Sequence, residues 1–386
     1  MATKSKKKKK SKSVGRQVRK LVLILFEMIC LVLLCGCIYG ISFITDRVNE
    51  IEFDKEFDTE QAGINEDIKE ETVEQMKGYT NIALFGLDTR KTGKYTEGNS
   101  DTIIIASINN DTNEVKLISV YRDTYLSMGN GKYDKANSAY NKGGAEMAVQ
   151  MLNANLDLNI TEYICVDWAA LVEAIDALGG VEIDVTKQEI DLINGYLNEI
   201  DKVLNITTPR ITGGPGKLLL TGSQATAYCR IRYTAGSDFL RTSRQRVVLQ
   251  AMLDKIKTSD LAALTNIATA VFDDIRTSLS LTEIMSLGRH VTNYSIVETS
   301  GFPLALTTAN PSDAKDSVVA VDLANNVKKL HNVLFGNAEY EPSVTVQAIS
   351  DSIVERTGVD INSPVIDTSK YNDTTDWEGT NDKDKQ

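Results

Sequence analysis

The chain of 386 residues has few of the residue types on which zinc centres and many hydrolytic sites depend. It contains two histidines, His290 and His331, and no Cys or His spacing that suits zinc. With so little histidine and no G-x-S-x-G motif, a Ser-His-Asp hydrolase is not expected. The glycine-rich run at 213–217 (GGPGK) lacks the Ser or Thr that follows the lysine of a phosphate-binding loop, so we interpret it as a turn.

Cysteine is also scarce. Three of the five cysteines, Cys30, Cys35 and Cys37, lie in one apolar run, where cysteine behaves as a small apolar residue. Cys165 and Cys229 remain, and two cysteines are too few for a disulfide framework. The sequence leaves open whether these two residues pair.

Residues 21–44 form an apolar run of membrane-spanning length, with Glu27 as its only charge. At a helical rise of about 1.5 Å per residue the run reaches about 36 Å, enough to cross a bilayer. A cleaved signal peptide is the alternative, but its apolar region should be shorter and end at small residues. Residues 1–20 carry ten Lys and Arg and no acid, which predicts a cytoplasmic tail. We therefore expect a single-pass protein of the cell membrane whose remaining chain is extracellular.

Positive charge is rare beyond that tail. Ten of the 42 basic residues lie in 1–20, which leaves 32 basic and 53 acidic residues in the rest of the chain. A net charge of −21 argues against binding to nucleic acid or to anionic surfaces in general. An anion must therefore be held by arginines gathered locally or by a metal ion.

The remaining chain divides into three segments of different amino-acid composition. Residues 45–78 are acidic and lack a strong apolar period, which predicts a stalk, and residues 341–386 are polar and predicted to be mostly disordered. Between them, strands and helices alternate, which predicts one α/β domain with helices on both faces of a sheet. The predicted strands are 81–86, 102–108, 114–120, 163–166, 181–185 and 318–321, and the predicted helices are 145–156, 168–178, 237–257, 261–272, 281–291 and 323–334.

Four short charged motifs stand at the ends of these elements. FGLDTR contains Asp88 and Arg90, SDTIII contains Asp101, and SVYRDT contains Arg122 and Asp123. The fourth motif, AYCRIRYTAGSDFLRTSRQR at 227–246, holds five arginines and a single acid. Such a local excess of arginine in an acidic chain indicates an anion site.

The spacing of these five arginines suggests how they act. Arg230 and Arg232 are two residues apart and would point to one side of an extended backbone. Arg241 and Arg244 are three apart and would share a face at the start of a helix, whose free N–H groups favour anions. The pattern predicts a clamp for a polyphosphate, because the planar guanidinium binds phosphate oxygens in pairs. Arg246 is interpreted as a solvated helix residue.

Asp88 and Asp101 add a metal to this hypothesis. Two carboxylates beside a diphosphate suit Mg²⁺, which usually takes one or two carboxylates together with phosphate oxygens and water. The alternative is that these charges form ordinary surface ion pairs, which have little energetic consequence. The residues alone leave both interpretations open.

Taken in order, these motifs resemble the LytR–CpsA–Psr family of bacterial cell-envelope proteins. The resemblance covers roughly residues 79–257 and is carried by NIALFGLDTR, SDTIIIASI, LISVYRDTYL, KANSAYNKGG, ALGGVEIDV, LTGSQATAYCRIRY and GSDFLRTSRQR. It implies an α/β/α sandwich with a central mixed sheet, a catalytic domain at 79–258, and a C-terminal α/β extension of that domain at 259–340. Tyr121 stands where the family commonly has proline, which is expected to alter the turn or the access to the pocket.

The resemblance implies an extracytoplasmic phosphotransferase of a Gram-positive bacterium. Such an enzyme moves an anionic glycopolymer (teichoic acid, capsule or a related chain) from a polyprenyl (undecaprenyl) diphosphate carrier to the muramic-acid 6-hydroxyl of peptidoglycan. In such an enzyme, the polyprenyl tail of the lipid carrier occupies a long apolar pocket. Two alternatives are a lipid-diphosphate phosphohydrolase and a non-catalytic polyprenyl-phosphate binder or envelope regulator.

The resemblance also assigns roles to residues of this chain. Asp238 is expected to orient groups or act as a base, Arg244 to support the clamp, and Lys135 and Asn137 to form a polar motif near the site. The expected metal ligands for Mg²⁺ (or Mn²⁺) are Asp88 and Asp101; the diphosphate-binding residues are Arg90, Arg122, Arg230, Arg232, Arg241 and Gln245; and the catalytic residues are Arg122, Asp101, Arg241 and Asp238.

Overall fold

The computed structural model describes residues 52–87, 95, 98–232, 237–259 and 275–368. The predicted cytoplasmic tail, the predicted span at 21–44 and the predicted helix at 261–272 lie outside these residues. Within the described ranges, none of the helices has both the length and the apolar character needed to cross a membrane.

A seven-stranded mixed sheet forms the centre of the fold. Its strand order is β1-β10-β7-β2-β3-β4-β11. The pairs β1–β10, β2–β7 and β4–β11 are parallel, and β10–β7, β2–β3 and β3–β4 are antiparallel. In sequence order the strands are β1 (Glu52–Phe53), β2 (Tyr79–Leu87), β3 (Ser100–Asn109), β4 (Glu114–Val120), β7 (Glu162–Val166), β10 (Ile275–Thr277) and β11 (Ser295–Phe302). The structure confirms the strands predicted at 81–86, 102–108, 114–120 and 163–166.

Both faces of the sheet are buried, which explains the continuous apolar runs of β2 and β3. Phe85 and Ile105 point into one core, and Ile82 and Ile104 into the other. Because successive side chains of a strand alternate between faces, a strand covered on both sides must be apolar at every position. The turn between β3 and β4 is closed by Asn109, whose Oδ1 accepts from the backbone N–H groups of Asp111 and Thr112.

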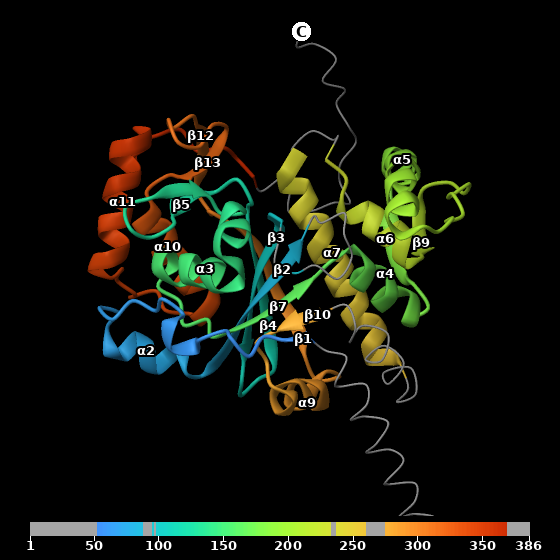
Figure 1. Cartoon of the computed structure of the whole chain (residues 1–386), viewed down its shortest axis with the longest axis horizontal. Helices are drawn as coiled ribbons and strands as arrows, with labels where there is room; N and C mark the ends of the chain where they lie inside the picture. Colours follow the sequence, from blue (N-terminus) through green and yellow to red (C-terminus); the bar gives the residue numbers. More distant parts are fainter. Residues whose placement is uncertain (1–51, 88–94, 96–97, 233–236, 260–274, 369–386) are drawn as a thin grey trace, which may run out of the picture. The chain divides into compact units, whose positions relative to one another are not determined.

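Helices cover the sheet on both sides (Figure 1). One face is covered by α3 and α10, with α11 packed against these two helices, and the other face packs against α7 and α9. The two short hairpins β5–β6 and β12–β13 lie on the α3 side (Figure 1). The bounds of these elements are α2 (Glu70–Met76), β5 (Tyr125–Ser127), β6 (Tyr133–Lys135), α3 (Ser138–Leu156), α7 (Ser237–Thr258), α9 (Leu281–His290), β12 (Leu306–Ala309), β13 (Ser317–Ala320), α10 (Leu323–Phe335) and α11 (Val344–Thr357).

A second, smaller core lies beside α7. It is formed by α4 (Trp168–Ala177), β8 (Val181–Val185), α5 (Lys187–Leu204), β9 (Gly216–Leu220) and α6 (Gly222–Cys229). Thr186 and Thr221 begin α5 and α6 with capping boxes, in which the threonine side chain accepts from a backbone N–H and a Glu or Gln three residues later returns the bond. The run at 213–217, interpreted as a turn, leads into β9 from Gly216 onwards.

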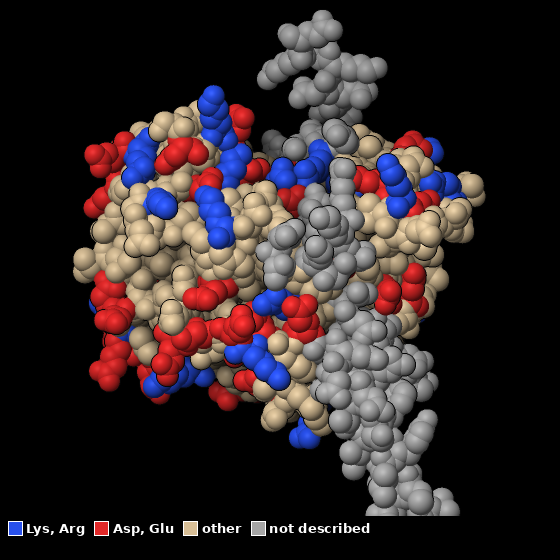
Figure 2. Space-filling view, in the orientation of Figure 1, with Lys and Arg blue, Asp and Glu red and all other residues tan. Residues whose placement is uncertain are grey.

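Two of the expected unstructured segments are folded. The predicted stalk at 45–78 is wrong from residue 52 on, because β1 pairs with β10 and the side chains of Ile68 and Met76 are buried in the main core. The predicted disorder of 341–386 is wrong for α11, which is capped by Ser343 and buries Val346 and Ile353. In both segments a few widely spaced apolar residues are enough to hold the chain in a folded conformation, because they pack into a core that the rest of the domain already forms. Acidic side chains nevertheless gather over α2, at the lower left of the molecule (Figure 2).

Candidate functional site

The hairpin of β3 and β4 brings Asp101 and Arg122 together. Asp101 lies at the start of β3, and Arg122 follows the end of β4, so the antiparallel pairing places both at the same edge of the sheet. Nη1 of Arg122 donates to both carboxylate oxygens of Asp101 at 3.0 Å. This contact joins two of the residues that the sequence assigns to the site.

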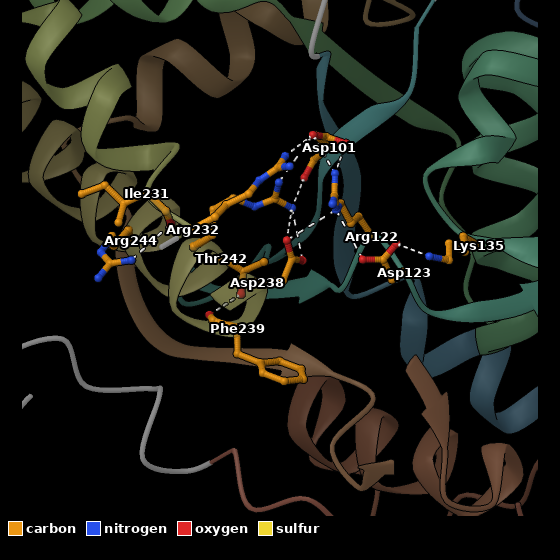
Figure 3. Close-up of polar contacts among 11 residues, drawn as sticks. Asp101, Arg122, Asp123, Lys135, Ile231, Arg232, Asp238, Phe239, Thr242 and Arg244 are labelled. Carbon is orange, nitrogen blue, oxygen red and sulfur yellow. Dashed lines mark hydrogen bonds and ion pairs between the residues drawn. The ribbon is translucent and has the colours of Figure 1, made fainter. Parts of the chain in front are cut away.

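Two further guanidinium groups reach the same carboxylate. Nη2 of Arg232, just beyond α6, donates to Oδ2 of Asp101. Nη2 of Arg241, in the first turns of α7, donates to the carbonyl oxygen of Asp101 at 2.8 Å, and its Nη1 lies 3.5 Å from Oδ2. Figure 3 shows the side chains of Arg122 and Arg232 converging on Asp101.

Asp238 completes the group. Its Oδ1 lies 2.9 Å from Nη2 of Arg241 and 3.4 Å from Nε of Arg122. We call Asp101, Arg122, Arg232, Asp238 and Arg241 the charged cluster. Its side chains come from β3, the end of β4, the segment after α6 and the start of α7, so four separate parts of the chain must be in place to form it.

The two carboxyl groups of the charged cluster are shifted in opposite directions. Burial alone would raise the pKa of Asp101, but the charges of Arg241, Arg122 and Arg232 outweigh it and hold the pKa below its usual range. At Asp238 burial dominates and raises the pKa, although Arg241 and Arg122 oppose it. Neighbouring carboxyls with divergent pKa values can take different roles, one remaining ionised and the other exchanging a proton.

Among the three arginines of the charged cluster, Arg241 is the most buried and Arg232 the most exposed. The side chain of Arg241 is 2% exposed, that of Arg122 24% and that of Arg232 35%. Burial also lowers the pKa of Arg241, with the charges of Arg232 and Arg122 acting in the same direction. A ligand arriving from solvent can therefore recruit Arg232 and Arg122 by rotation, whereas Arg241 is fixed by its surroundings.

Asp123, Lys135 and Asn137 hold the loop that carries Arg122. Nζ of Lys135 lies 2.9 Å from Oδ1 of Asp123, whose other oxygen is 3.4 Å from Nε of Arg122 (Figure 3). The backbone N–H of Asn137 donates to the carbonyl oxygen of Arg122 at 3.0 Å. The polar motif expected near the site is thus placed beside Arg122.

An apolar cavity of about 300 Å³ ends at the charged cluster. It lies between the sheet face of β2, β3 and β7 and the helices α4, α6 and α7. Its apolar wall includes Leu84, Ile104, Ile164, Leu171, Leu249 and Met252, and its polar end includes Asp101, Arg230, Arg232, Arg241 and Gln245. Gln245 presents a buried Oε1 that accepts no hydrogen bond from the described residues. The cavity therefore joins an apolar space to an end lined by three arginines.

Arg230 lies apart from the charged cluster, which corrects the predicted strand edge. It ends α6 in a helical conformation, because the capping box at Thr221 starts a helix that continues to Cys229. Its Nη2 donates to Glu199 of α5 at 3.1 Å, and its guanidinium stacks 3.6 Å above the ring of Trp168. Arg230 still lines the cavity, but it does so from the second core.

Arg244 and Arg246 also differ from expectation. Nε of Arg244 donates to Oε1 of Glu189 at 2.9 Å, and its side chain points away from Asp101 (Figure 3), so it does not share a binding face with Arg241. The interpretation of Arg246 as a solvated residue is wrong: it is 3% exposed, and its Nη1 donates to Oγ of Ser119 at 2.9 Å. Because α7 lies against the sheet, this position faces β4 rather than solvent.

Sequence reasoning missed Trp168 and Glu199, which hold Arg230. Trp168 carried a signal, because it is one of two tryptophans and follows the end of a predicted strand. Glu199 carried none, since it is one acid among many on α5. Cys165 and Cys229 are both buried and free, so they do not pair.

The predicted metal ligands are only partly placed. Asp88 and Arg90 lie outside the described residues. Within the described ranges, no group of three His, Cys, Asp or Glu side chains is arranged to hold a metal ion by itself.

Curated proteins with similar sequences include cell-wall transferases. The chain is 32% identical over 209 residues to a polyisoprenyl-teichoic acid–peptidoglycan teichoic acid transferase, TagU, of Enterococcus faecalis, covering 53% of this chain and 63% of that protein. It is 27% identical over 244 residues to the corresponding TagV of Bacillus subtilis, covering 61% and 58%. The chain therefore spans less than two thirds of the length of either relative.

Solved structures and a family model agree on the fold. A crystal structure of a Streptococcus agalactiae protein superimposes with a TM-score of 0.57 and 25% identity, covering 72% of this chain and 93% of that one. The model of the LytR_cpsA_psr family matches residues 48–332, a range that contains the sheet, the cavity and the charged cluster. The chain belongs to the LytR–CpsA–Psr family.

Proposed function

We propose that the protein is a phosphotransferase that moves a glycopolymer from a polyprenyl diphosphate carrier to peptidoglycan. The observation that carries this proposal is the apolar cavity of about 300 Å³ whose polar end is lined by Asp101 and by the guanidinium groups of Arg230, Arg232 and Arg241. Arg122 contacts the same Asp101 carboxylate. A polyprenyl diphosphate has the same division into a long apolar tail and a strongly anionic head. The names of the relatives, which are teichoic acid transferases, support the same substrate class.

The exposure of the arginines suggests how the diphosphate is held. The carboxylate of Asp101 accepts from the guanidinium groups of Arg122 and Arg232. A diphosphate can replace that carboxylate, because guanidinium binds phosphate oxygens in pairs and both side chains are partly exposed. Arg241 stays in place as the fixed donor, and Arg230 and Gln245 reach the head group from the cavity side.

The proposed reaction is attack by a sugar hydroxyl of peptidoglycan on the phosphorus next to the glycopolymer. A new phosphorus–oxygen bond forms, and the bond to the lipid phosphate breaks, so the leaving lipid monophosphate takes the electron pair. Arg122, Arg232 and Arg241 stabilise the charge that develops on it, and positioning supplies the rest of the acceleration. The hydroxyl proton passes to the carboxylate of Asp238, whose raised pKa makes it a better base.

The charged cluster fits Mg²⁺ if the ion arrives with the diphosphate. Asp101 and Asp238 offer carboxylate oxygens, the donors that Mg²⁺ prefers, and Oδ1 of Asp238 is buried and contacts Arg241 and Arg122 as an ion pair without accepting a hydrogen bond from the described residues. Both oxygens of Asp101 face guanidinium groups, which a diphosphate would draw away. We propose that Asp101, together with Asp88, holds the ion. When bound, Mg²⁺ neutralises charge on the phosphate oxygens.

The proposal includes an extracytoplasmic location. It rests on residues 1–44, where a basic segment precedes an apolar run of membrane-spanning length. The relatives come from Enterococcus and Bacillus species, which fits a cell-wall protein of a Gram-positive bacterium. A membrane anchor would place the domain where both the lipid carrier and peptidoglycan are found.

Transfer by the full-length protein in detergent tests the proposal. The assay supplies Mg²⁺, a polyprenyl-diphosphate-linked teichoic acid precursor and peptidoglycan, and measures polymer bound to the glycan strands. Arg122→Ala should lower transfer about 10²–10³-fold, the usual effect of removing a donor that stabilises developing charge. Lys217→Gln, in an exposed ion pair with Glu182 across the paired strands β8 and β9, is the matched control and should keep full activity.

Three other outcomes would contradict the proposal. Equal release of lipid phosphate with and without peptidoglycan would identify a phosphohydrolase. Tight binding of the lipid without any turnover would identify a carrier-binding protein. Full transfer by Arg122→Ala would mean that the charged cluster is not the active site.

A further inference from the structure

Tyr121 stands between β4 and Arg122, and its backbone is fixed on both sides. Its N–H donates to the carbonyl oxygen of Phe302 at 3.0 Å, which extends the pairing of β4 with β11 by one residue. Its carbonyl oxygen accepts from the N–H of Thr124 at 2.9 Å. Proline at this position could not donate the first of these bonds, so the tyrosine secures the turn that leads into Arg122.

The ring of Tyr121 fills the space above Gly301 on the neighbouring strand. A Cβ atom added to Gly301 would lie 2.0 Å from the tyrosine hydroxyl oxygen and 2.4 Å from Cζ. Both distances are far below any van der Waals contact, so a larger residue at 301 would have to move the ring. The glycine is therefore required by the ring and not by the backbone of β11.

The other side of the ring meets α7. The rings of Tyr121 and Phe239 are edge to face, with centroids 4.7 Å apart and planes at 86°. Phe239 lies between Asp238 and Arg241 in the first turns of α7, and its ring points away from Asp101 (Figure 3). The contact therefore joins the strand end that carries Arg122 to the helix start that carries the other two residues.

Arg246 makes a second connection between the same two elements. It lies farther along α7, and its Nη1 donates to Ser119, two residues before Tyr121 on β4. Its guanidinium is buried, and among the described residues it forms no ion pair with a carboxylate. A buried cation without a carboxylate partner is costly, so Arg246 joins α7 to β4 through Ser119 at some cost in stability.

We propose that Tyr121 is a positioning residue for the phosphotransfer. Its ring, wedged between Gly301 and Phe239, sets the separation between the end of β4 and the start of α7. That separation fixes the 3.4 Å contact between Nε of Arg122, after β4, and Oδ1 of Asp238, on α7. The inference rests on the proposed function, because it concerns the geometry of the same charged cluster.

Gly301→Ala tests the inference without changing any charged residue. The added methyl group should displace the Tyr121 ring and shift Arg122 relative to α7. A misplacement of about 1 Å commonly costs up to about 10²-fold, so we expect kcat to fall at least about tenfold. The KM for the lipid donor should rise less than kcat falls, because neither Tyr121 nor Gly301 lines the cavity proposed for the tail. Gly288→Ala on α9, where the methyl group meets no atom, is the matched control.

Variants of Tyr121 separate positioning from general destabilisation. Tyr121→Phe keeps the ring and should retain near wild-type kcat. In a Tyr121→Ala background the ring is gone, so Gly301→Ala should cause no further loss of kcat. Phe239→Leu, which preserves apolar burial and loses the edge-to-face contact, should lower kcat in the same direction as Gly301→Ala. Thermal unfolding of each full-length variant identifies any that fail to fold.

The affinity for inorganic pyrophosphate keeps this inference distinct from the proposed function. Wild-type protein that binds pyrophosphate but transfers no polymer would contradict the proposed function, while a Gly301→Ala protein with at least about fivefold weaker pyrophosphate binding would still support positioning. Wild-type kcat and pyrophosphate affinity in Gly301→Ala would overturn the inference. An equal loss from Gly301→Ala with and without the Tyr121 ring would overturn it as well.

Discussion

Nη2 of Arg241 lies 2.9 Å from Oδ1 of Asp238, one helical turn earlier on α7, and the same nitrogen donates to the carbonyl oxygen of Asp101. One buried guanidinium therefore holds both carboxyl-bearing elements of the site, the start of β3 and the start of α7. The stability of the fold and the geometry of the site meet in this residue.

Replacing Arg241 by alanine should lower both the stability of the fold and the transfer activity. Removing one partner from a buried ionic contact typically costs about 3–5 kcal/mol, and the lower end applies here because Arg122 and Arg232 still face Asp101. We expect the free energy of unfolding, measured with urea, to fall by about 3 kcal/mol, and transfer activity to be lost. Lys187→Ala, which breaks an exposed pair with Asp191, should cost less than about 1 kcal/mol. Equal effects of the two substitutions would contradict the arrangement.

The pH dependence of transfer should report Asp238. Its pKa is raised by burial, so the carboxylate needed as a base is lost at a higher pH than for an ordinary aspartate, whose pKa is about 3.9. In a plot of kcat against pH, the fall in rate on the acid side should therefore have its midpoint above the pKa of an ordinary aspartate. The rate should decrease as the pH falls through that midpoint. Asp238→Asn should lower kcat and remove the limb. An unchanged limb in this variant would assign the proton transfer to another group.

Acid should destabilise the fold through His331. This histidine lies on α10 and is fully buried against the end of α3, where its Nε2 is 3.0 Å from the carbonyl oxygen of Leu156, and burial lowers its pKa to about 4. The unfolded chain takes up a proton on this histidine near pH 6.5, whereas the folded chain does so only near pH 4. Protonation therefore favours the unfolded chain, and the free energy of unfolding falls as the pH decreases from about 6.5 towards 4. We expect a loss of about 3 kcal/mol over this window by urea unfolding. His331→Phe should flatten the curve, and an unchanged slope would point to another group.

Releasing Arg230 should strengthen diphosphate binding. Glu199 engages Nη2 of Arg230, and its side chain is partly exposed. Glu199→Gln removes the competing charge, so the affinity for inorganic pyrophosphate by calorimetry should rise about two- to fivefold, the scale of an exposed ion pair. Arg230→Ala should change the affinity in the opposite direction. Weaker binding by both variants would mean that Glu199 orients Arg230 and does not compete with the ligand.

The centre of the site could be predicted from the sequence because it depends on strand ends. The apolar runs of β3 and β4 are long enough to assign, and an antiparallel hairpin necessarily brings Asp101 at its start beside Arg122 at its end. Arg232 and Arg241 could also be predicted to belong to the site, because the segment that carries them holds five arginines in twenty residues. The predicted metal and the roles of individual residues stay predictions.

The errors share a physical cause. Spacing along the chain shows which side chains are neighbours, but it does not show what covers them. Arg246 has the sequence context of a surface residue and is buried because α7 lies against β4. The two-residue spacing of Arg230 and Arg232 predicts an extended backbone, whereas the capping box at Thr221 starts a helix that ends at Arg230. The helix α11 was missed because its two buried apolar residues are useful only to a core that is already formed.

The turn between β3 and β4 offers a place to attach a reporter. Asp101 and Arg122 occupy the open end of this hairpin, and Asn109 closes the other end, about 27 Å away for eight strand residues. Asp111 and Thr112 in the turn are exposed. A fluorescent tag or a short affinity peptide inserted between them would leave the pairing of the two strands intact. The protein could then be labelled or immobilised without disturbing the residues proposed to act on the lipid.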